Sequence, residues 1–151
     1  MYEIITIIEN MDPTVLGGAV LAITGLTTIL AFAALVRYVM CGIGYGKMFQ
    51  KAGEASWKAW VPFYNTYMSY KISWKGLFFF IYLALTIVAK LPIDLSFVLS
   101  AAAIASLVIA ILQNIKMAAL FGKGKGTGFA LAFFPGITSM ILGLGKAEFQ
   151  K

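Results

Sequence analysis

The sequence predicts an all-α membrane protein with four transmembrane helices, an aromatic interfacial helix between the first and second, and a last helix kinked at Pro135-Gly136. The first observation behind this fold class is composition: of 151 residues, 61% are hydrophobic and 12% charged, and the mean hydropathy is +0.89. Soluble domains are about 45–50% apolar and about 25% charged. Long uncharged runs and a one-sided distribution of lysine and arginine are the other two observations. So few charged side chains could not cover a soluble globule of this length, which excludes that class.

The first span is predicted for residues 15–40, after an acidic extracellular N-terminus over residues 1–14. Residues 15–36 carry no charge, and a helix needs about 20 apolar residues to cross a hydrocarbon core of roughly 30 Å. Asp12, Pro13 and Thr14 supply an acceptor side chain and an early proline, which favour a helix start. A signal peptide begins with basic residues, so we expect this segment to be retained.

Three more spans follow. The second is predicted for residues 75–92, where the uncharged residues between Lys75 and Lys90 reach only about 21 Å as a helix. The two lysines can snorkel to close the gap. The third span is predicted for residues 95–118 and the fourth for residues 127–145, with the proline kink near its middle. A kinked segment can also re-enter and leave on the same side, so two positions stay open for the tail, residues 146–151.

Lysine and arginine in short loops set the orientation, because they stay on the inner side. The N-terminal residues 1–14 have three acidic side chains and no basic one. With both termini outside, nine of the twelve basic residues fall on the inner side. The sequence therefore predicts that both termini lie outside. The net charge of +6 then reflects topology and attraction to anionic headgroups, and it does not predict nucleic-acid binding.

The connection over residues 41–74 is predicted to be a basic and aromatic segment at the cytoplasmic interface. Its aromatic residues recur at helical spacing between lysines, which suits a helix at headgroup level. Pro62 should break this helix, and Lys51-Ala-Gly53 has the pattern of a helix end. We favour an aromatic anchoring belt over a docking surface for a lipid or partner. The candidate contact residues, including two from the cytoplasmic Gly/Lys turn over residues 119–126, are Trp57, Lys58, Trp60, Tyr64, Asn65, Tyr67, Lys71, Trp74, Lys123 and Lys125.

Small residues at four-residue spacing predict close approach of helices within the membrane. Packing inside one chain is the favoured interpretation, with contact between copies as the alternative. For Asn65, beside Pro62, a structural role in satisfying freed backbone groups is favoured over a ligand contact. The predicted packing positions are Gly18, Ala22 and Gly25, then Ala102, Ser106, Ala110 and Asn114, and finally Gly128, Ala132 and Gly136.

Catalytic, cofactor and metal sites are not predicted. The sequence has no histidine, and its single cysteine, Cys41, forbids an internal disulfide or a multi-thiolate site. Serine with lysine is the remaining nucleophile–base pair, but Ser56 with Lys58 and Ser69 with Lys71 would diverge on a helix. The glycine and lysine residues after Phe121 do not meet the phosphate-loop spacing. We therefore expect no enzyme.

Several of these segments resemble a known family. Lys51-Ala-Gly, then Trp57 to Asn65 (WKAWVPFYN), then Phe121-Gly-Lys-Gly and Ile141 to Gly145 (ILGLG) are similar to an uncharacterised family of small bacterial integral membrane proteins. The resemblance covers roughly residues 45–149, and it implies a bacterial cytoplasmic membrane and no activity. Some members are labelled signal peptidase I. That label is not carried over, because the chain lacks an outward-facing serine–lysine pair in a suitable extramembrane domain.

The sequence thus predicts a non-enzymatic, multi-pass protein of the bacterial cell membrane. We expect it to act through contacts with membrane lipid, including anionic headgroups, and with a second copy or another membrane protein. The alternative is a small oligomeric channel or transporter for ions or small solutes, lined by the face that carries Ser106 and Asn114. A proton-coupled transporter normally has a carboxylate at the membrane midplane, and the predicted spans have none.

Overall fold

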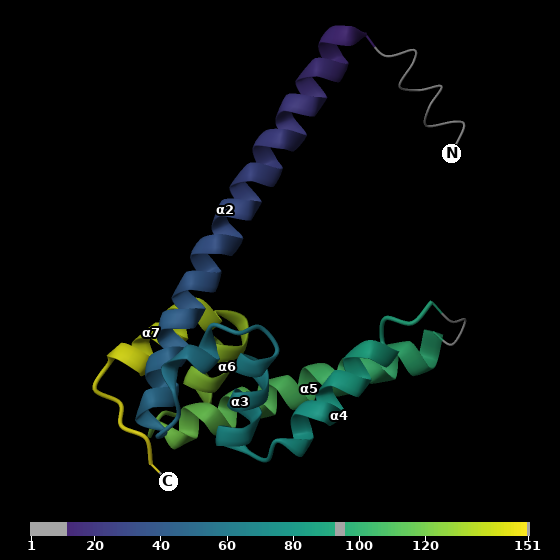
Figure 1. Cartoon of the computed structure of the whole chain (residues 1–151). Helices are drawn as coiled ribbons and strands as arrows, with labels where there is room; N and C mark the ends of the chain where they lie inside the picture. Colours follow the sequence, from purple (N-terminus) through teal and green to yellow (C-terminus); the bar gives the residue numbers. More distant parts are fainter. Residues whose placement is uncertain (1–11, 93–95, 151) are drawn as a thin grey trace. The chain divides into compact units, whose positions relative to one another are not determined.

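The computed structural model describes residues 12–92 and 96–150, and these residues form helices and turns with no strand. The all-α part of the prediction is confirmed. Figure 1 shows the helices in chain order. They are α2 (Pro13–Lys51), the short 3-10 helix η1 (Ser56–Ala59), α3 (Tyr64–Ser73), α4 (Leu77–Val88), α5 (Ser96–Leu120), α6 (Lys125–Phe133) and α7 (Pro135–Leu144). Most of the predicted acidic N-terminus lies outside the described residues.

The chain divides into two compact units, Met1–Arg37 and Tyr38–Lys151. In the first unit the described residues are the beginning of α2. Asp12 starts this helix as the sequence predicts: its carboxylate accepts hydrogen bonds from the Thr14 backbone N–H at 2.8 Å and from the Thr14 hydroxyl at 2.6 Å. Such a side-chain acceptor satisfies N–H groups that have no partner within the first turn. Pro13 is the first helical residue.

Helix α2 continues beyond residue 40, the predicted end of the first span, and ends at Lys51. The predicted helix end at Lys51-Ala-Gly53 is confirmed. Gly53 has a φ of 80°, a left-handed conformation that glycine adopts without a steric penalty. The residues after it turn back through η1, and the backbone N–H of Glu54 bonds to the carbonyl of Phe49 at 2.8 Å.

In the second unit, α4 and α5 pack side by side, and α3 packs against both of them. Helices α2 and α5 are long and apolar enough to cross a membrane, whereas α4, with 12 residues, and α7, with 10, are shorter apolar helices. The largest core cluster gathers side chains from α2, α5, α6, α7 and the turn after α5. Its buried members are Met48, Met117, Phe121, Leu131 and Leu142.

The single kinked helix predicted over residues 127–145 is two helices, and this corrects the prediction. Helix α6 ends at Phe133 and α7 begins at Pro135, with Phe134 between them at φ −123° and ψ 59°. Proline lacks a backbone N–H and suits the first turn of a helix, so it begins a new helix here instead of bending an existing one. The helix is interrupted where the sequence predicts, but the interruption separates two helices instead of bending one.

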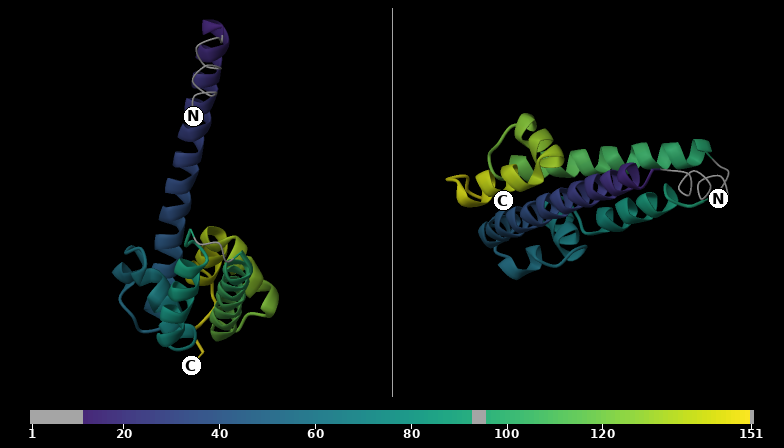
Figure 2. Two further views of the ribbon diagram at one scale, coloured as in Figure 1. Left: turned by 90° about the vertical axis from the view of Figure 1, so that its right-hand side faces the viewer. Right: turned by 90° about the horizontal axis from the view of Figure 1, so that it is seen from above.

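Helices α6 and α7 lie at the C-terminal end of α5, and the tail after α7 returns to that end (Figure 2). The backbone N–H of Gln150 bonds to the carbonyl of Leu120 at 2.6 Å. The rings of Phe121 and Phe149 meet edge to face, with centroids 5.7 Å apart. The chain therefore leaves the end of α5 along α6 and returns to the same end after α7.

Candidate functional site

Helices α2 and α7 cross in close backbone contact at two glycines. A Cβ added to Gly44 would lie 2.6 Å from the backbone nitrogen of Met140, which is closer than real Cβ contacts. A Cβ on Gly143 would meet the carbonyl oxygen of Gly44 and would lie 3.0 Å from the Cβ of Lys47. Contacts of this kind let helix backbones approach without intervening side chains. Neither Gly44 nor Gly143 was a predicted packing position. The three glycines at positions 42, 44 and 46 were the available sign that other segments approach this part of the helix closely.

The ammonium group of Lys51 caps the C-terminal end of α7. Its Nζ donates to the carbonyl oxygens of Leu142 at 2.9 Å, Gly145 at 2.7 Å and Ala147 at 2.8 Å. These three hydrogen bonds use all the donors of the group. A cation is favourable at this position because the last carbonyls of a helix have no partner within the helix.

Aromatic rings predicted to form the belt stack into a continuous row along η1, α3 and α4. The rings of Trp57 and Tyr64 are nearly parallel at 5.9 Å, and Tyr64 stacks on Tyr67 at the same distance. Tyr67 then contacts Phe79 edge to face at 5.7 Å. Trp57 remains 60% exposed, so this row presents an aromatic surface outward. Its predicted contact with lipid stays a prediction.

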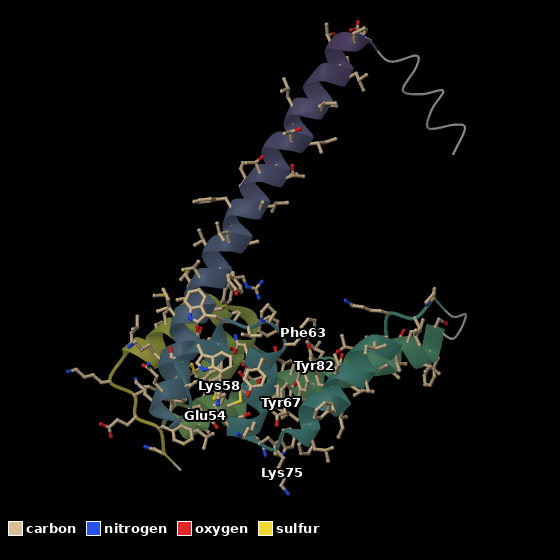
Figure 3. The ribbon with its side chains drawn as sticks, in the orientation of Figure 1. Glu54, Lys58, Phe63, Tyr67, Lys75 and Tyr82 are labelled. Carbon is tan, nitrogen blue, oxygen red and sulfur yellow. The ribbon has the colours of Figure 1, made fainter. Side chains whose placement is uncertain are left out.

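Two of the predicted lipid-contacting lysines form ion pairs within the chain. Glu54 accepts from Lys58 Nζ at 2.5 Å and from Lys71 Nζ at 3.0 Å (Figure 3). The hydrogen bond from Lys58, and then the one from Lys71, lowers the pKa of the Glu54 carboxyl, and Glu54 raises the pKa of Lys71. Because Lys58 lies in η1 and Lys71 in α3, the two ion pairs of Glu54 connect these helices. Glu54 was not among the predicted contact residues, so this role was missed.

The other predicted lysines differ in environment. Lys123 and Lys125, around the start of α6, are exposed. Lys116, which was not a predicted contact residue, lies with its Nζ 4.0 Å from the centroid of the Trp74 ring, a cation–π contact. Trp74 also stacks on Phe78 at 3.8 Å. Trp60 has a different partner from the rest of the belt: its backbone carbonyl accepts a hydrogen bond from the Tyr38 hydroxyl at 2.5 Å.

A strained turn at Phe63 follows Pro62. Phe63 has φ 61° and ψ −46°, and the backbone N–H of Tyr64 bonds to the carbonyl of Pro62 at 2.6 Å. This combination is the rare γ-turn, which costs energy for a residue with a side chain. The prediction that Pro62 breaks the interfacial helix is confirmed, since η1 ends at Ala59 and α3 begins at Tyr64. The Phe63 side chain is 74% exposed.

The predicted packing positions have mixed outcomes. A Cβ on Gly128 would meet the backbone of Ile115, so α6 approaches α5 closely there. Ala102 and Gly136 are buried, while Ala110 and Ala132 are half-buried. Ser106 donates its hydroxyl to the carbonyl of Ala103 at 2.8 Å, which satisfies it within its own helix. Gly18, Ala22 and Gly25 lie in the first unit, whose described residues are the beginning of α2, so their role stays a prediction.

A polar cavity of about 170 Å³ lies within the second unit, between α3, α4, α5 and the end of α2, which contributes Tyr45. Asn114 donates to the carbonyl of Ala110 at 2.9 Å, and the buried Gln113 donates to Ser73 Oγ at 3.3 Å. Tyr70 is 2% exposed, and its hydroxyl has no hydrogen-bond partner among the described residues. Burial raises the pKa of this phenol. The polar side chains on the wall include Asn65, Ser69, Tyr70, Tyr82, Gln113 and Asn114.

The sequence predicted Asn65 and Asn114 separately, as a residue beside a proline break and a packing position. The structure brings the two into the wall of one cavity. Asn65 also accepts the Ser69 hydroxyl on its backbone carbonyl at 2.9 Å. Ser69, Tyr70, Tyr82 and Gln113 were not predicted as site residues. Only the tertiary fold reveals them, because the wall comes from separate segments distributed between residues 45 and 114.

Residues 57–151, more than half of the chain, match the model of a family of unknown function (DUF5684). The chain belongs to this family. The match confirms the expectation of an uncharacterised family, and the matched residues include α3 to α7 but not α2. No curated protein matches the chain, and no solved structure matches it. The family description assigns no activity to its members.

Proposed function

We propose that this chain is a non-enzymatic integral protein of a bacterial cell membrane, which acts through contacts with lipid and with a second copy or another membrane protein. The observation that carries the proposal is the pair of helices α2 and α5, both long and apolar enough to cross a bilayer. In α5, the large apolar side chains Phe97, Ile104 and Leu107 are more than half exposed. Exposure of such a surface to water is unfavourable, whereas contact with lipid tails is not.

The proposed topology has three crossings, by the first part of α2, by α4 and by α5, and one re-entrant pair, α6 and α7. Nine residues of α6 extend about 14 Å, roughly half of the hydrocarbon core. The return of the chain to Leu120 supports re-entry over a fourth crossing. The C-terminal tail then lies inside, with Lys146 and Lys151, and the N-terminus outside.

Charge supports this topology over the one with both termini outside. Moving the tail inward places eleven of the twelve basic residues on the inner side, leaving only Lys90 outside. Lysine and arginine are strongly enriched on the inner side of membrane proteins. Helix α4, with 12 residues, reaches about 18 Å, so Lys75 and Lys90 at its ends would snorkel to complete its crossing.

Two serine hydroxyls that could serve as nucleophiles have partners within their own helices, which supports a role without catalysis. Ser69 donates to the carbonyl of Asn65 at 2.9 Å, and Ser139, which is fully buried, donates to the carbonyl of Gly136 at 3.1 Å. In residues 12–92 and 96–150, no three histidine, cysteine or acidic residues group to hold a metal ion. The exposed lysines Lys123 and Lys125 suit phosphate headgroups instead.

The proposal is tested by extraction and lipid analysis. The protein should stay in the membrane through an alkaline carbonate wash, and in mild detergent it should elute as an oligomer or with bound anionic lipid. The double variant Lys123→Gln/Lys125→Gln should retain less anionic lipid than wild type, whereas Lys90→Gln, on the opposite side, should not. Release by carbonate, or a monomer without lipid or partner, would contradict the proposal.

A small channel or transporter is the second candidate, and the polar cavity is the observation that favours it. The sequence predicted a polar pore face that carries Ser106 and Asn114. Asn114 lines this cavity, but Ser106 does not belong to its wall. Vesicles that contain the purified protein should then pass ions or small solutes, and Asn114→Leu should reduce that flux. Vesicles that pass none would remove this candidate.

A further inference from the structure

The polar groups on the wall of this cavity are all uncharged. Amide, hydroxyl and phenol groups line it, and none of its described lining residues is charged. A charged ligand buried there would lose its hydration without gaining a counter-charge. An apolar ligand would leave the amides and phenols without partners. A neutral ligand with several hydrogen-bonding groups fits this wall.

The hydroxyl of Tyr70 is a second observation that favours a hydrogen-bonding ligand in the cavity. It is buried and unpartnered among the described residues, and Tyr70 is part of the cavity wall. Nearly all buried polar groups in proteins have a partner, from the protein, from water or from a ligand. Asn114 also faces the cavity with unused capacity, because its described hydrogen bond to Ala110 uses only one of its amide hydrogens.

We propose that this cavity binds a neutral polyhydroxyl group, either a free polyol or the sugar headgroup of a membrane lipid. Hydroxyl groups both donate and accept, as do the amides of Asn65, Gln113 and Asn114 that would meet them. The rings of Tyr70 and Tyr82, stacked at 5.6 Å, add an aromatic surface for the C–H side of such a group.

The size of the cavity agrees with this class of ligand. At about 30 Å³ for each molecule of liquid water, 170 Å³ corresponds to between five and six waters. A glycerol unit or one sugar ring is of this order, whereas a whole lipid is not. The acyl chains of a lipid would have to remain outside. Only the lipid source depends on the proposed membrane location; the free polyol does not.

The test compares two tyrosine variants on the same helix. Tyr70→Phe removes the unpartnered hydroxyl, and Tyr64→Phe makes the same change at an exposed position outside the cavity wall. Glucose binding, measured by saturation-transfer NMR in detergent against choline as a cationic control, tests the free source. Native mass spectrometry from nanodiscs with glucosyl diacylglycerol or plain diacylglycerol tests the lipid source. Tyr70→Phe should weaken binding about three- to tenfold, the effect of one hydrogen bond.

Each outcome decides the proposal. Preference for glucose over choline identifies a free polyol, and preference for the glucosyl lipid over diacylglycerol identifies a headgroup; either one, reduced by Tyr70→Phe and not by Tyr64→Phe, supports the site. No preference in both arms, or equal loss in the two variants, overturns it. If Tyr70→Phe does not fold, Asn114→Leu replaces it. The glucose arm needs no bilayer, so its result is separate from the carbonate extraction that tests membrane insertion.

Discussion

Lys51 shows how one residue joins distant parts of the chain. Its three hydrogen bonds reach carbonyls more than 90 residues away, at the end of α7 and in the tail. Lys51→Met keeps most of the side-chain volume but leaves these carbonyls without the charged donor. We expect a loss of about 2 kcal/mol in the free energy of unfolding, since hydrogen bonds to a charged group contribute about 1.5–3 kcal/mol.

Denaturation of the purified protein in detergent, followed by near-UV circular dichroism, measures this loss. Lys123→Met is the matched control, because Lys123 is exposed and no described ion pair involves it. The control should stay within about 0.5 kcal/mol of wild type, as surface substitutions usually do. Equal stability of Lys51→Met and Lys123→Met would show that the cap contributes nothing.

A residue's role can be read from the sequence only where its partner is close in the chain, and even there the prediction missed one. Glu54 and Lys58 are four residues apart, a spacing at which charges meet on a turn, although the prediction gave Lys58 to lipid instead. Lys71 lies 17 residues from Glu54, and only the fold brings it there. The unpartnered Tyr70 hydroxyl is likewise invisible in the sequence, because a missing partner is a property of three-dimensional surroundings.

At the scale of elements, the crossing of α2 and α7 depends on glycine. Gly44→Ala would place a methyl group against the backbone of Ser139 and Met140, where nothing can rotate away. Overpacking of this kind costs about 1–3 kcal/mol. We therefore expect Gly44→Ala to lower the midpoint of thermal unfolding and to loosen α7, which protease sensitivity of the tail would report.

Gly126 offers a matched control within a helix of the same unit. A Cβ added there meets nothing within 4 Å, so Gly126→Ala should be neutral or should stabilise α6 by up to about 1 kcal/mol through helix propensity. If Gly44→Ala and Gly126→Ala change the midpoint of thermal unfolding alike, helix propensity determines their effect. The close contact of α2 with α7 would then not limit stability.

Elements followed from the sequence where local signals decide them. Asp12-Pro13 begins α2, Gly53 follows its end, and Pro135 begins α7, each by a mechanism confined to a few residues. The extension of α2 to Lys51 was not predicted, because hydrophobicity indicates the span and not the length of the helix. The close approach of α6 to α5 and of α7 to α2 was not predicted either, because it depends on packing, which periodicity does not contain.

For the whole molecule, the proposed topology gives a direct prediction. In a Cys41→Ser background, Glu148→Cys should react with an impermeant maleimide only after intact cells are permeabilised, since the tail returns to the end of α5. Leu91→Cys, in the turn between α4 and α5, should react without permeabilisation and serves as the control. Labelling of Glu148→Cys from outside would restore a fourth crossing and an outside C-terminus.

Composition and charge placement by themselves predicted the all-α class and the long apolar runs of α2 and α5, because these properties add up along the chain without knowledge of contacts. Membership of an uncharacterised family was also visible in short motifs and is confirmed over residues 57–151. Tertiary structure alone decided that the chain returns to Leu120 and that Asn65, Tyr70 and Asn114 share one cavity. Both depend on segments distant in sequence that meet only when the helices pack, and packing is set by shape and by the partners of buried polar groups.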